Sequence, residues 1–161
     1  MMSVDTGALP KRRAPARGGR RRSRELAVQG LYQWLVNETS ASDLLEQLRA
    51  TKEHAQADDA YLATLINGTT AQALALRAKL APHLDREAHQ LSPVEHAVLL
   101  LGVYELTACL DVPYKVVINE AVELGKIFGG TDGHKYINGV LDRLAPELRP
   151  SETGQQAPRS S

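Results

Sequence analysis

The sequence predicts an all-α protein with one compact domain of six or seven helices. Apolar residues recur at intervals of three and four in successive segments, as they do on the inward face of a helix, and no segment sustains the alternation of a half-buried strand. Ala, Leu and Val dominate the apolar residues, with one Trp and one Phe among 161 residues, and this balance favours helix over sheet. A chain of this length suits one hydrophobic core.

The first three helices are predicted upstream of Pro82, which ends the third. Ser23 caps the first helix, which reaches about residue 36. The second begins at Ala41 or Ser42, and the third begins near Asp58. The inward faces of the three helices carry, in order, Ala27, Leu31, Trp34 and Leu35; Leu44, Leu45 and Leu48; and Tyr61, Leu62, Leu65, Ile66, Ala73, Leu76 and Leu80.

A central helix is predicted to follow Ser92. Ser92 caps this helix, Pro93 occupies its first position, and Glu95 stands at the third, which is the spacing of a capping box. The segment 94–109 is apolar almost all round. We therefore expect this helix to be buried in the middle of the bundle.

Two more helices complete the predicted bundle. The first of them starts after a break at residues 111–113 and stops at the glycines 129–130. The second is capped by Thr131 or Asp132 and ends before Pro146. Their inward faces carry Val117, Ala121, Leu124 and Phe128, and then Ile137, Val140, Leu141 and Leu144.

Charge divides the chain into an arm, a domain and a tail. The first 24 residues hold eight Lys or Arg and one acid, a local charge of +7, which the other 137 residues, with 11 bases and 18 acids, cancel. The bases are Lys11, Arg12, Arg13, Arg17, Arg20, Arg21, Arg22 and Arg24, interleaved with Pro and Gly. Such a segment has too few apolar residues to fold alone. We predict a disordered basic arm at 1–22, a helical domain at 23–148 and a flexible tail at 149–161.

A basic arm of this kind most often contacts an anion such as a nucleic-acid backbone. The alternative is a solvated tail that only aids solubility. Composition alone leaves both open.

Most kinds of chemistry lack their residues in this sequence. The single cysteine, Cys109, lies in an apolar run and excludes an intrachain disulfide. The histidines have no paired metal-ligand spacing, and the segment 129–135 lacks the Gly-Lys-Ser/Thr of a phosphate-binding loop. No nucleophile has an evident base. We predict a binding protein rather than an enzyme, with no metal and no cofactor.

The sequence also predicts a soluble, cytoplasmic protein. Its amino terminus lacks the apolar core of a secretory signal. No apolar run in the central segment approaches the roughly 20 residues that a membrane span needs. A single buried cysteine fits a reducing compartment.

Two aromatic regions suit unstacked nucleic-acid bases. Tyr32 lies off the inward stripe of the first helix, on the face that carries Arg24. Phe128, Asp132 and Tyr136 surround a polar loop, where rings can stack on bases and a carboxylate can accept hydrogen bonds from base amino groups. The structural alternatives are packing at the domain edge for Tyr32 and capping of the last helix for Asp132.

Two stretches of the chain are long enough to identify a family. One runs from Arg20 and reads Arg-Arg-Arg-Ser-Arg-Glu-Leu-Ala-Val-Gln-Gly-Leu-Tyr-Gln-Trp. The other runs from Val94 to Pro150 and includes Tyr-Glu-Leu at 104–106, Asp-Val-Pro-Tyr-Lys-Val at 111–116, Ile-Asn-Glu-Ala-Val-Glu-Leu at 118–124 and Gly-Val-Leu-Asp at 139–142. Both closely resemble the NusB family of bacterial transcription antitermination factors, and the likeness is loose only from about residue 37 to residue 90.

The resemblance implies an all-helical domain of two subbundles that binds boxA RNA of ribosomal or phage leaders together with the ribosomal small-subunit protein NusE. The pair would join other Nus factors on RNA polymerase to suppress termination. By position, the resemblance implies backbone contacts by Arg20, Arg21, Arg22 and Arg24, contacts near the bases by Tyr32, His83, Phe128, Asp132 and Tyr136, and a contact of Glu95 with the ribosomal protein. The implied oligomeric state is a monomer or a homodimer.

Two features depart from the family, and two other classes of protein stay open. His83 stands where family members can have a tyrosine, and the longer arm should raise nonspecific RNA affinity at low salt. The same helical domain is appended to some RNA cytosine methyltransferases, which would require a catalytic extension. A helical oligomerisation module would bind RNA weakly and without sequence preference.

Overall fold

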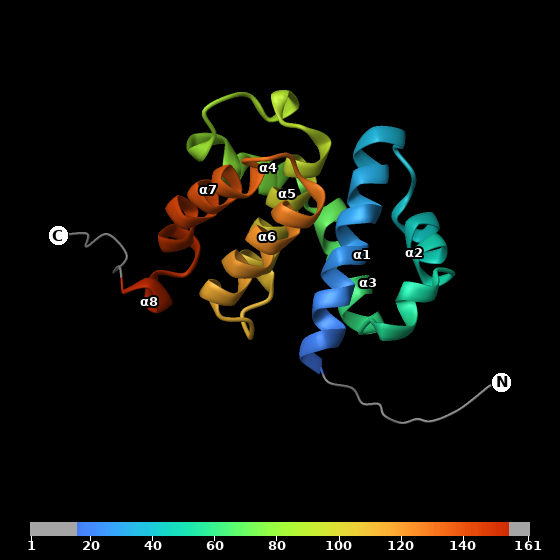
Figure 1. Ribbon diagram of the computed structural model, residues 1–161. Helices are drawn as coiled ribbons and strands as arrows, with labels where there is room; N and C mark the ends of the chain where they lie inside the picture. The colour runs from blue at the N-terminus through green and yellow to red at the C-terminus, as the bar shows by residue number, and fades with distance from the viewer. Residues whose placement is uncertain (1–15, 155–161) are drawn as a thin grey trace.

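The structure, a computed structural model, describes residues 16–154, and every regular element within that range is helical (Figure 1). The α-helices are α1 (Ala16–Asn37), α2 (Ala41–Arg49), α3 (Asp59–Ala71), α4 (Ala73–Leu80), α5 (Pro93–Ala108), α6 (Tyr114–Phe128), α7 (Gly133–Leu148) and α8 (Pro150–Thr153). Short 3-10 helices lie at Lys52–Gln56, Ala81–His83 and Ala88–Gln90. The predicted all-α class is confirmed.

The helices form two subbundles that meet along α1 and α5. In Figure 1, α2 and α3 lie beside α1, while α4, α6 and α7 surround α5. α1 also packs directly on α5, and the buried residues of both subbundles belong to one continuous apolar cluster. The described part of the chain is therefore a single domain with one core.

The burial of α5 agrees with its apolar sequence. Every residue from Ala97 to Leu106 is buried, as predicted for a central helix. Ser92 caps α5 through its Oγ, which accepts a hydrogen bond from the backbone N of Glu95 at 3.1 Å. At Gly102 an added Cβ would lie 2.9 Å from Cδ1 of Leu141, so the missing side chain lets α7 pack closely against α5.

The first helix begins seven residues earlier than predicted, at Ala16 rather than Ser23. Ser23 is fully buried, and its Oγ lies 2.9 Å from the carbonyl O of Gly19 and 2.7 Å from that of Asp58. The same Oγ accepts a hydrogen bond from the backbone N of Asp58 at 3.0 Å. Ser23 therefore joins α1 to the start of α3 and does not cap a helix. Residues 16–22, predicted as part of the arm, are helical, while Lys11, Arg12 and Arg13 lie outside the described residues.

Two other helix boundaries differ from the prediction. The long third helix is divided at Gln72, whose φ of −107° and ψ of 14° depart from helical values, so that α3 and α4 are separate helices. The last long helix continues through Pro146 to Leu148.

Residues 149–154 are part of the fold, although the sequence predicted a flexible tail from Arg149. This arginine is only 4% exposed, and its guanidinium donates hydrogen bonds to three backbone carbonyls at the end of α5. The distances are 2.7 Å to Leu106, 3.2 Å to Glu105 and 3.1 Å to Cys109. Carbonyls at a helix end often lack a backbone donor. Arg149 is the donor to Leu106 and a second donor to Glu105 and Cys109, which also accept from the backbone N of Cys109 and of Val112. The rest of the predicted tail, 155–161, lies outside the described residues.

A half-buried histidine, His96, connects α4, α5 and the end of α1. The Nε2 atom of His96 accepts a hydrogen bond from Nε of Arg77 at 3.0 Å, and the Arg77 guanidinium lies 5.8 Å from the ring centroid of Trp34. Burial, with the nearby charge of Arg77, lowers the pKa of His96 from 6.5 to about 4. His96 is therefore neutral in the folded protein at neutral pH.

We expect His96 to lower the free energy of unfolding in mild acid. The unfolded chain takes up a proton at an ordinary pKa near 6.5, but the folded protein resists protonation down to about 4. The contribution of neutral His96 to the free energy of unfolding is therefore fully present above pH 6.5 and is lost as the pH falls from 6.5 toward 4. The loss between neutral pH and about pH 5 is about 2 kcal/mol. Urea unfolding at the two pH values measures this loss. The His96→Gln variant keeps an acceptor for Arg77 without titrating, so it should lose about 2 kcal/mol less; equal losses in both proteins would contradict the assignment to His96.

Candidate nucleic-acid interface

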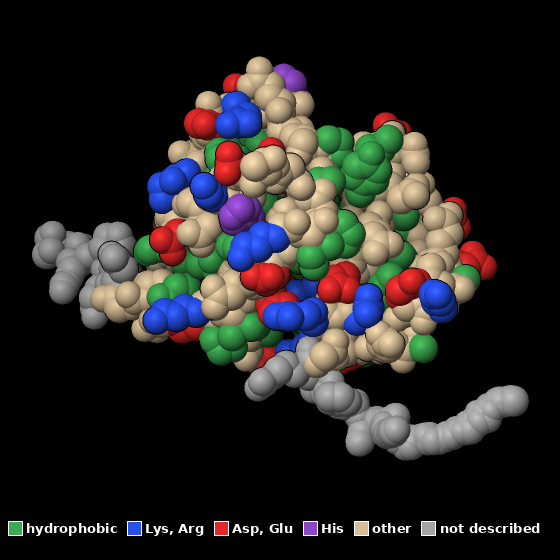
Figure 2. Space-filling model, in the orientation of Figure 1, with side chains coloured by type: hydrophobic (Ala, Val, Ile, Leu, Met, Phe, Trp, Pro, Cys, Tyr) green, Lys and Arg blue, Asp and Glu red, His purple; other side chains and the backbone are tan. Residues whose placement is uncertain are grey.

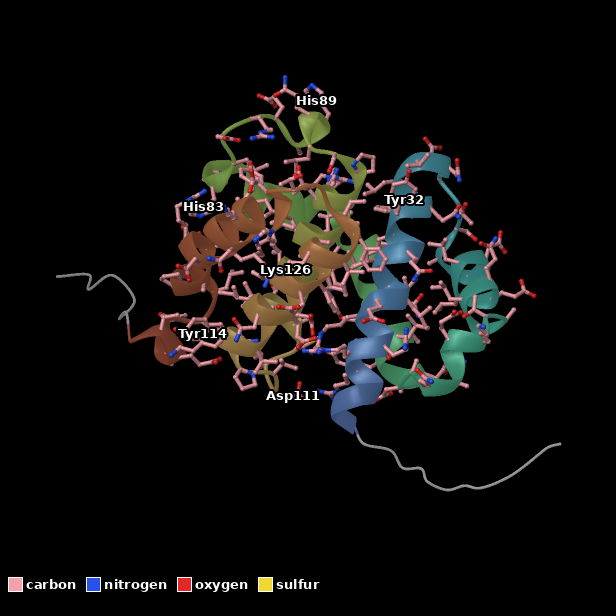
Figure 3. All side chains as sticks on the ribbon, in the orientation of Figure 1. Tyr32, His83, His89, Asp111, Tyr114 and Lys126 are labelled. Carbon is pink, nitrogen blue, oxygen red and sulfur yellow. The ribbon has the colours of Figure 1, made fainter. Side chains whose placement is uncertain are left out.

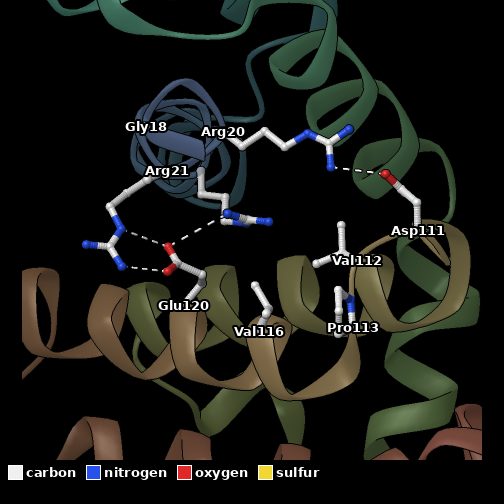
Figure 4. A pocket seen from close by; sticks show the side chains of 9 residues that line it. Gly18, Arg20, Arg21, Asp111, Val112, Pro113, Val116 and Glu120 are labelled. Carbon is white, nitrogen blue, oxygen red and sulfur yellow. Dashed lines mark hydrogen bonds and ion pairs between the residues drawn. The ribbon is translucent and has the colours of Figure 1, made fainter. Parts of the chain in front are cut away.

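The predicted arginines emerge from the first turns of α1, where that helix runs beside α6 (Figure 4). Arg21 is held by both oxygens of Glu120, with Nε 3.1 Å from Oε1 and Nη2 2.6 Å from Oε2. This bidentate hydrogen bond raises the pKa of Arg21 above its usual value. Arg22 donates to Oε1 of Glu25 and to Oε1 of Gln56, each at 2.9 Å. Both guanidinium groups reach the surface.

Arg24 is buried and serves the core. Its Nε lies 3.0 Å from each carboxylate oxygen of Glu105, which also accepts a hydrogen bond from the hydroxyl of Tyr61, and its Nη1 lies 3.7 Å from Oε1 of Glu120. Burial raises the pKa of the Glu105 carboxyl, an effect that Arg24 and Tyr61 partly offset. With 4% of its surface exposed, Arg24 joins α1 to α5, and its guanidinium is already engaged by Glu105. Of the four arginines predicted to contact the RNA backbone, Arg24 is therefore the one that the geometry does not favour.

Arg20 lies flat on an aromatic ring. The carbon of its guanidinium is 4.2 Å from the ring centroid of Tyr61, and its Nη1 donates to Oδ2 of Asp111 at 3.1 Å. Each of the four arginines thus has a carboxylate partner from elsewhere in the fold or the same helix. On the face shown in Figure 2, Lys and Arg side chains lie among Asp and Glu side chains and form no broad basic area.

A cleft of about 730 Å³ opens between the start of α1 and the start of α6 (Figure 4). Its charged lining consists of Arg20, Arg21, Arg24, Asp111 and Glu120, and its apolar lining of Val112, Pro113 and Val116, with Gly18 at one edge. Arginine, carboxylate and aliphatic surface therefore meet in one depression.

The second predicted surface is the loop between α6 and α7 with the segment packed beside it. Phe128 is half-buried against the core, and Asp132 is exposed, with Oδ1 3.4 Å from Nζ of Lys135. Asp132 is the N-cap residue of α7, as predicted, although its side chain makes no capping hydrogen bond there. The hydroxyl of Tyr136 donates to Oδ1 of Asp85 at 3.0 Å, and the guanidinium of Arg86 lies 4.6 Å from the Tyr136 ring centroid.

The structure separates some of the predicted contacts and joins others. In Figure 3, Tyr32 on α1 and His83 beside α7 lie on opposite sides of α6, whose Lys126 appears between them. Tyr32 is 42% exposed, and His83 Nε2 lies 2.8 Å from Oε2 of Glu147. An added Cβ on Gly133 would lie 3.2 Å from Oε2 of Glu95. The predicted protein contact therefore adjoins the loop predicted to touch bases.

Sequence reasoning missed the acidic and apolar partners of the arginines. The sequence pattern assigns no partner to Glu120, and it marks Asp111 only as part of the break at residues 111–113. Arg21 and Glu120 are 99 positions apart, and Arg20 and Asp111 are 91 apart. No local pattern signals such pairs, because they are formed only when α1 packs beside α6.

Other site classes find no support in the described residues. Among them, no group of three or more His, Cys, Asp or Glu side chains is arranged to hold a metal ion. No helix in this range is long and apolar enough to cross a membrane.

Known proteins resemble this chain in sequence and in fold. A family model described as NusB family matches residues 21–146. A Paraburkholderia phymatum protein named transcription antitermination protein NusB is 55% identical over 137 residues, or 85% of this chain and 94% of the relative. A protein of the same name from Cupriavidus pinatubonensis is 50% identical over 145 residues, or 90% and 87%. These relatives are named as antitermination proteins and not as enzymes, in agreement with the prediction.

Solved structures give the same result for the fold. T. maritima NusB has a TM-score of 0.74 at 26% identity and is matched over 89% of this chain and 99% of its own. A crystal structure described as antitermination factors NusB and NusE in complex with dsRNA shares the fold, with a TM-score of 0.68 at 22% identity over 79% of this chain and 96% of that one. A family match over most of the chain and relatives half identical along nearly their whole length confirm the predicted family: the chain belongs to the NusB family.

Proposed function

We propose that this protein is a transcription antitermination factor that binds single-stranded boxA-type RNA together with the ribosomal small-subunit protein NusE. One observation carries the proposal furthest: Arg20, Arg21 and Arg22 reach the surface within a single turn of α1, directly after a segment rich in further bases. Clustered guanidinium groups supply the sequence-independent attraction to phosphates. The NusB–NusE complex with RNA that shares this fold supports the choice of partners.

The second surface supplies the means to distinguish RNA sequences. Tyr32, Phe128 and Tyr136 offer rings to unstacked bases, and the exposed carboxylate of Asp132 accepts hydrogen bonds from base amino groups but repels phosphates. His83 would add a further planar side chain beside α7. Glu95 is proposed to contact NusE, and its place beside Gly133 would bring that partner next to the RNA.

The wider assembly is part of the same proposal. The pair would join other Nus factors and RNA polymerase in the cytoplasm, with this chain as a monomer or a homodimer. Fluorescence anisotropy with a boxA-type RNA and a scrambled RNA, each with and without NusE, tests the core of it. Preference for boxA that increases with NusE supports the proposal, and equal binding of both RNAs under all conditions contradicts it.

Arg21 and Arg22 are expected to set the salt dependence of RNA binding. Replacing both with Ala should weaken boxA-type and scrambled RNAs by the same factor, because phosphate contacts carry no sequence information. The slope of log affinity against log salt should flatten by about 1.4, since each phosphate contact on a single strand contributes about 0.7. A salt titration by anisotropy measures the slope. Arg49→Ala, which removes an exposed arginine of α2 that pairs with Asp59, is the control and should leave the slope unchanged.

A further inference from the structure

Arg20 differs from Arg21 and Arg22 because its guanidinium lies over an aromatic ring. One face of its guanidinium lies on the ring of Tyr61 at 4.2 Å, and its Nη1 is bound to Asp111 at 3.1 Å. Tyr61 is itself held in place, since it is 6% exposed and its hydroxyl donates to the buried carboxylate of Glu105. A guanidinium stacked on a ring and bonded at its edge is a rigid planar platform.

The exposed side of this platform belongs to the cleft. The side chain of Arg20 is 33% exposed and lines the depression together with Val112, Pro113 and Val116. Figure 4 shows Arg20 extending from α1 toward Asp111, with the aliphatic side chains below it. Val116 is 40% exposed, so part of its side chain is available to a ligand in the cleft. The cleft thus combines a flat cation with an uncovered apolar floor.

The charges of the lining limit what can fit. Arg20 and Arg21 balance Asp111 and Glu120, and the third arginine of the lining, Arg24, is paired with the buried Glu105. A negative group of a ligand would therefore be met at the rim, by the exposed guanidinium of Arg21. The apolar floor and the guanidinium plane favour a flat ring, because bases stack on arginine planes as well as on aromatic side chains. Asp111, 66% exposed in its side chain, can accept a hydrogen bond from a base amino group. A nucleotide has all three features.

We propose that this cleft binds one unstacked nucleobase of the RNA, stacked on the outer face of the Arg20 guanidinium and above Val116. The inference rests on the proposed RNA-binding function and deepens it, because it changes Arg20 from a phosphate contact into a base contact. Arg21, at the rim of the same cleft, would remain available to a phosphate. The RNA-binding surface then extends to Val112, Pro113 and Val116, which no phosphate contact would require.

An abasic scan of the RNA, combined with a lysine substitution, tests the proposal. Arg20→Lys keeps the positive charge but removes the plane. Abasic nucleotides keep the phosphate and remove the base, so each position of a boxA-type RNA is replaced in turn and its affinity measured by anisotropy. With the unchanged protein, one abasic position should weaken binding about 5- to 150-fold, the range for a stacked base. Arg20→Lys should bind intact RNA more weakly by a similar factor and be indifferent to that position.

Arg49→Lys is the control, because Arg49 is exposed, pairs with Asp59 away from the arginine turn of α1, and does not line the cleft. It should bind intact RNA with little change and keep the full pattern of abasic effects. Val116→Asp, at an exposed position that should tolerate the change, tests the floor and should lose sensitivity at the same nucleotide as Arg20→Lys. The proposal is overturned if Arg20→Lys behaves as Arg49→Lys does, or if both Arg20→Lys and Val116→Asp keep every abasic effect. An unchanged protein that binds no RNA would instead overturn the proposed function.

Discussion

Replacing Glu105 with Ala is expected to lower the free energy of unfolding by about 3 to 5 kcal/mol. Glu105 is 2% exposed and binds the guanidinium of Arg24 through both carboxylate oxygens, while also accepting the hydrogen bond of Tyr61. Without this carboxylate, a buried guanidinium and a buried phenol lose their main partner at once. The penalty for leaving a buried charge uncompensated exceeds the net value of the ion pair. Urea denaturation followed by circular dichroism measures the change.

Two further variants test whether the loss comes from the buried charge. Glu123→Ala removes an exposed carboxylate of α6 that lies 3.3 Å from Nζ of Lys126, and it should cost less than about 1 kcal/mol because exposed ion pairs contribute little. Replacing Arg24 by Met together with Glu105 by Leu should cost less than Glu105→Ala alone, since no unpaired charge remains. If Glu105→Ala costs no more than Glu123→Ala, the buried pair does not hold the subbundles together.

Replacing Arg149 with Ala is expected to cost about 3 kcal/mol, the second largest effect on stability. The guanidinium donates to the carbonyls of Leu106, Glu105 and Cys109, and each would lose its charged donor in a buried environment. The carbonyl of Leu106 would be left unpaired, which costs about 1 to 3 kcal/mol, whereas those of Glu105 and Cys109 keep the backbone N of Cys109 and of Val112 as donors and lose only the bond to the charged group. Thermal and urea unfolding of the full chain give the change directly.

Arg143→Ala is the appropriate comparison for Arg149→Ala. Arg143 belongs to the same region of the chain, is exposed and donates one hydrogen bond, to the carbonyl of His83 at 2.9 Å. Its loss should cost under about 1 kcal/mol, as for an exposed polar contact. Equal losses for the two arginines would show that Arg149 does not anchor the end of α5.

The fold was predictable wherever the deciding interactions are local. The apolar stripes, the cap at Ser92 and the all-round burial of α5 follow from spacing within one helix, and the structure agrees with each. The errors concern contacts that cross the sequence. Ser23 has the residue type of a cap, but its hydroxyl binds Asp58, 35 positions away, and the helix starts earlier. Arg149 resembled the start of a polar tail, yet its partner Leu106 lies 43 positions back.

The candidate site divides in the same way. The resemblance identified the exposed arginines and the loop with Asp132, and the structure places these residues at the surface. It also places Arg24 in the core, where its guanidinium forms an ion pair with Glu105. Basic composition cannot distinguish an arginine that faces solvent from one that faces a buried acid, because the difference depends on where α5 packs. The roles of these residues in RNA binding stay predictions.

Glu120 gives the arginine surface an unusual property. Its carboxylate already provides Arg21 with the two-pronged anionic partner that a phosphate would provide. On the proposed function, an RNA that arrives at this turn of α1 exchanges one anion for another, and the gain at Arg21 is only the difference between two similar bonds. The same carboxylate recaptures the guanidinium as soon as the phosphate moves away. The first turns of α1 would therefore hold RNA lightly and let it go quickly, and retention would depend on contacts made elsewhere on the molecule.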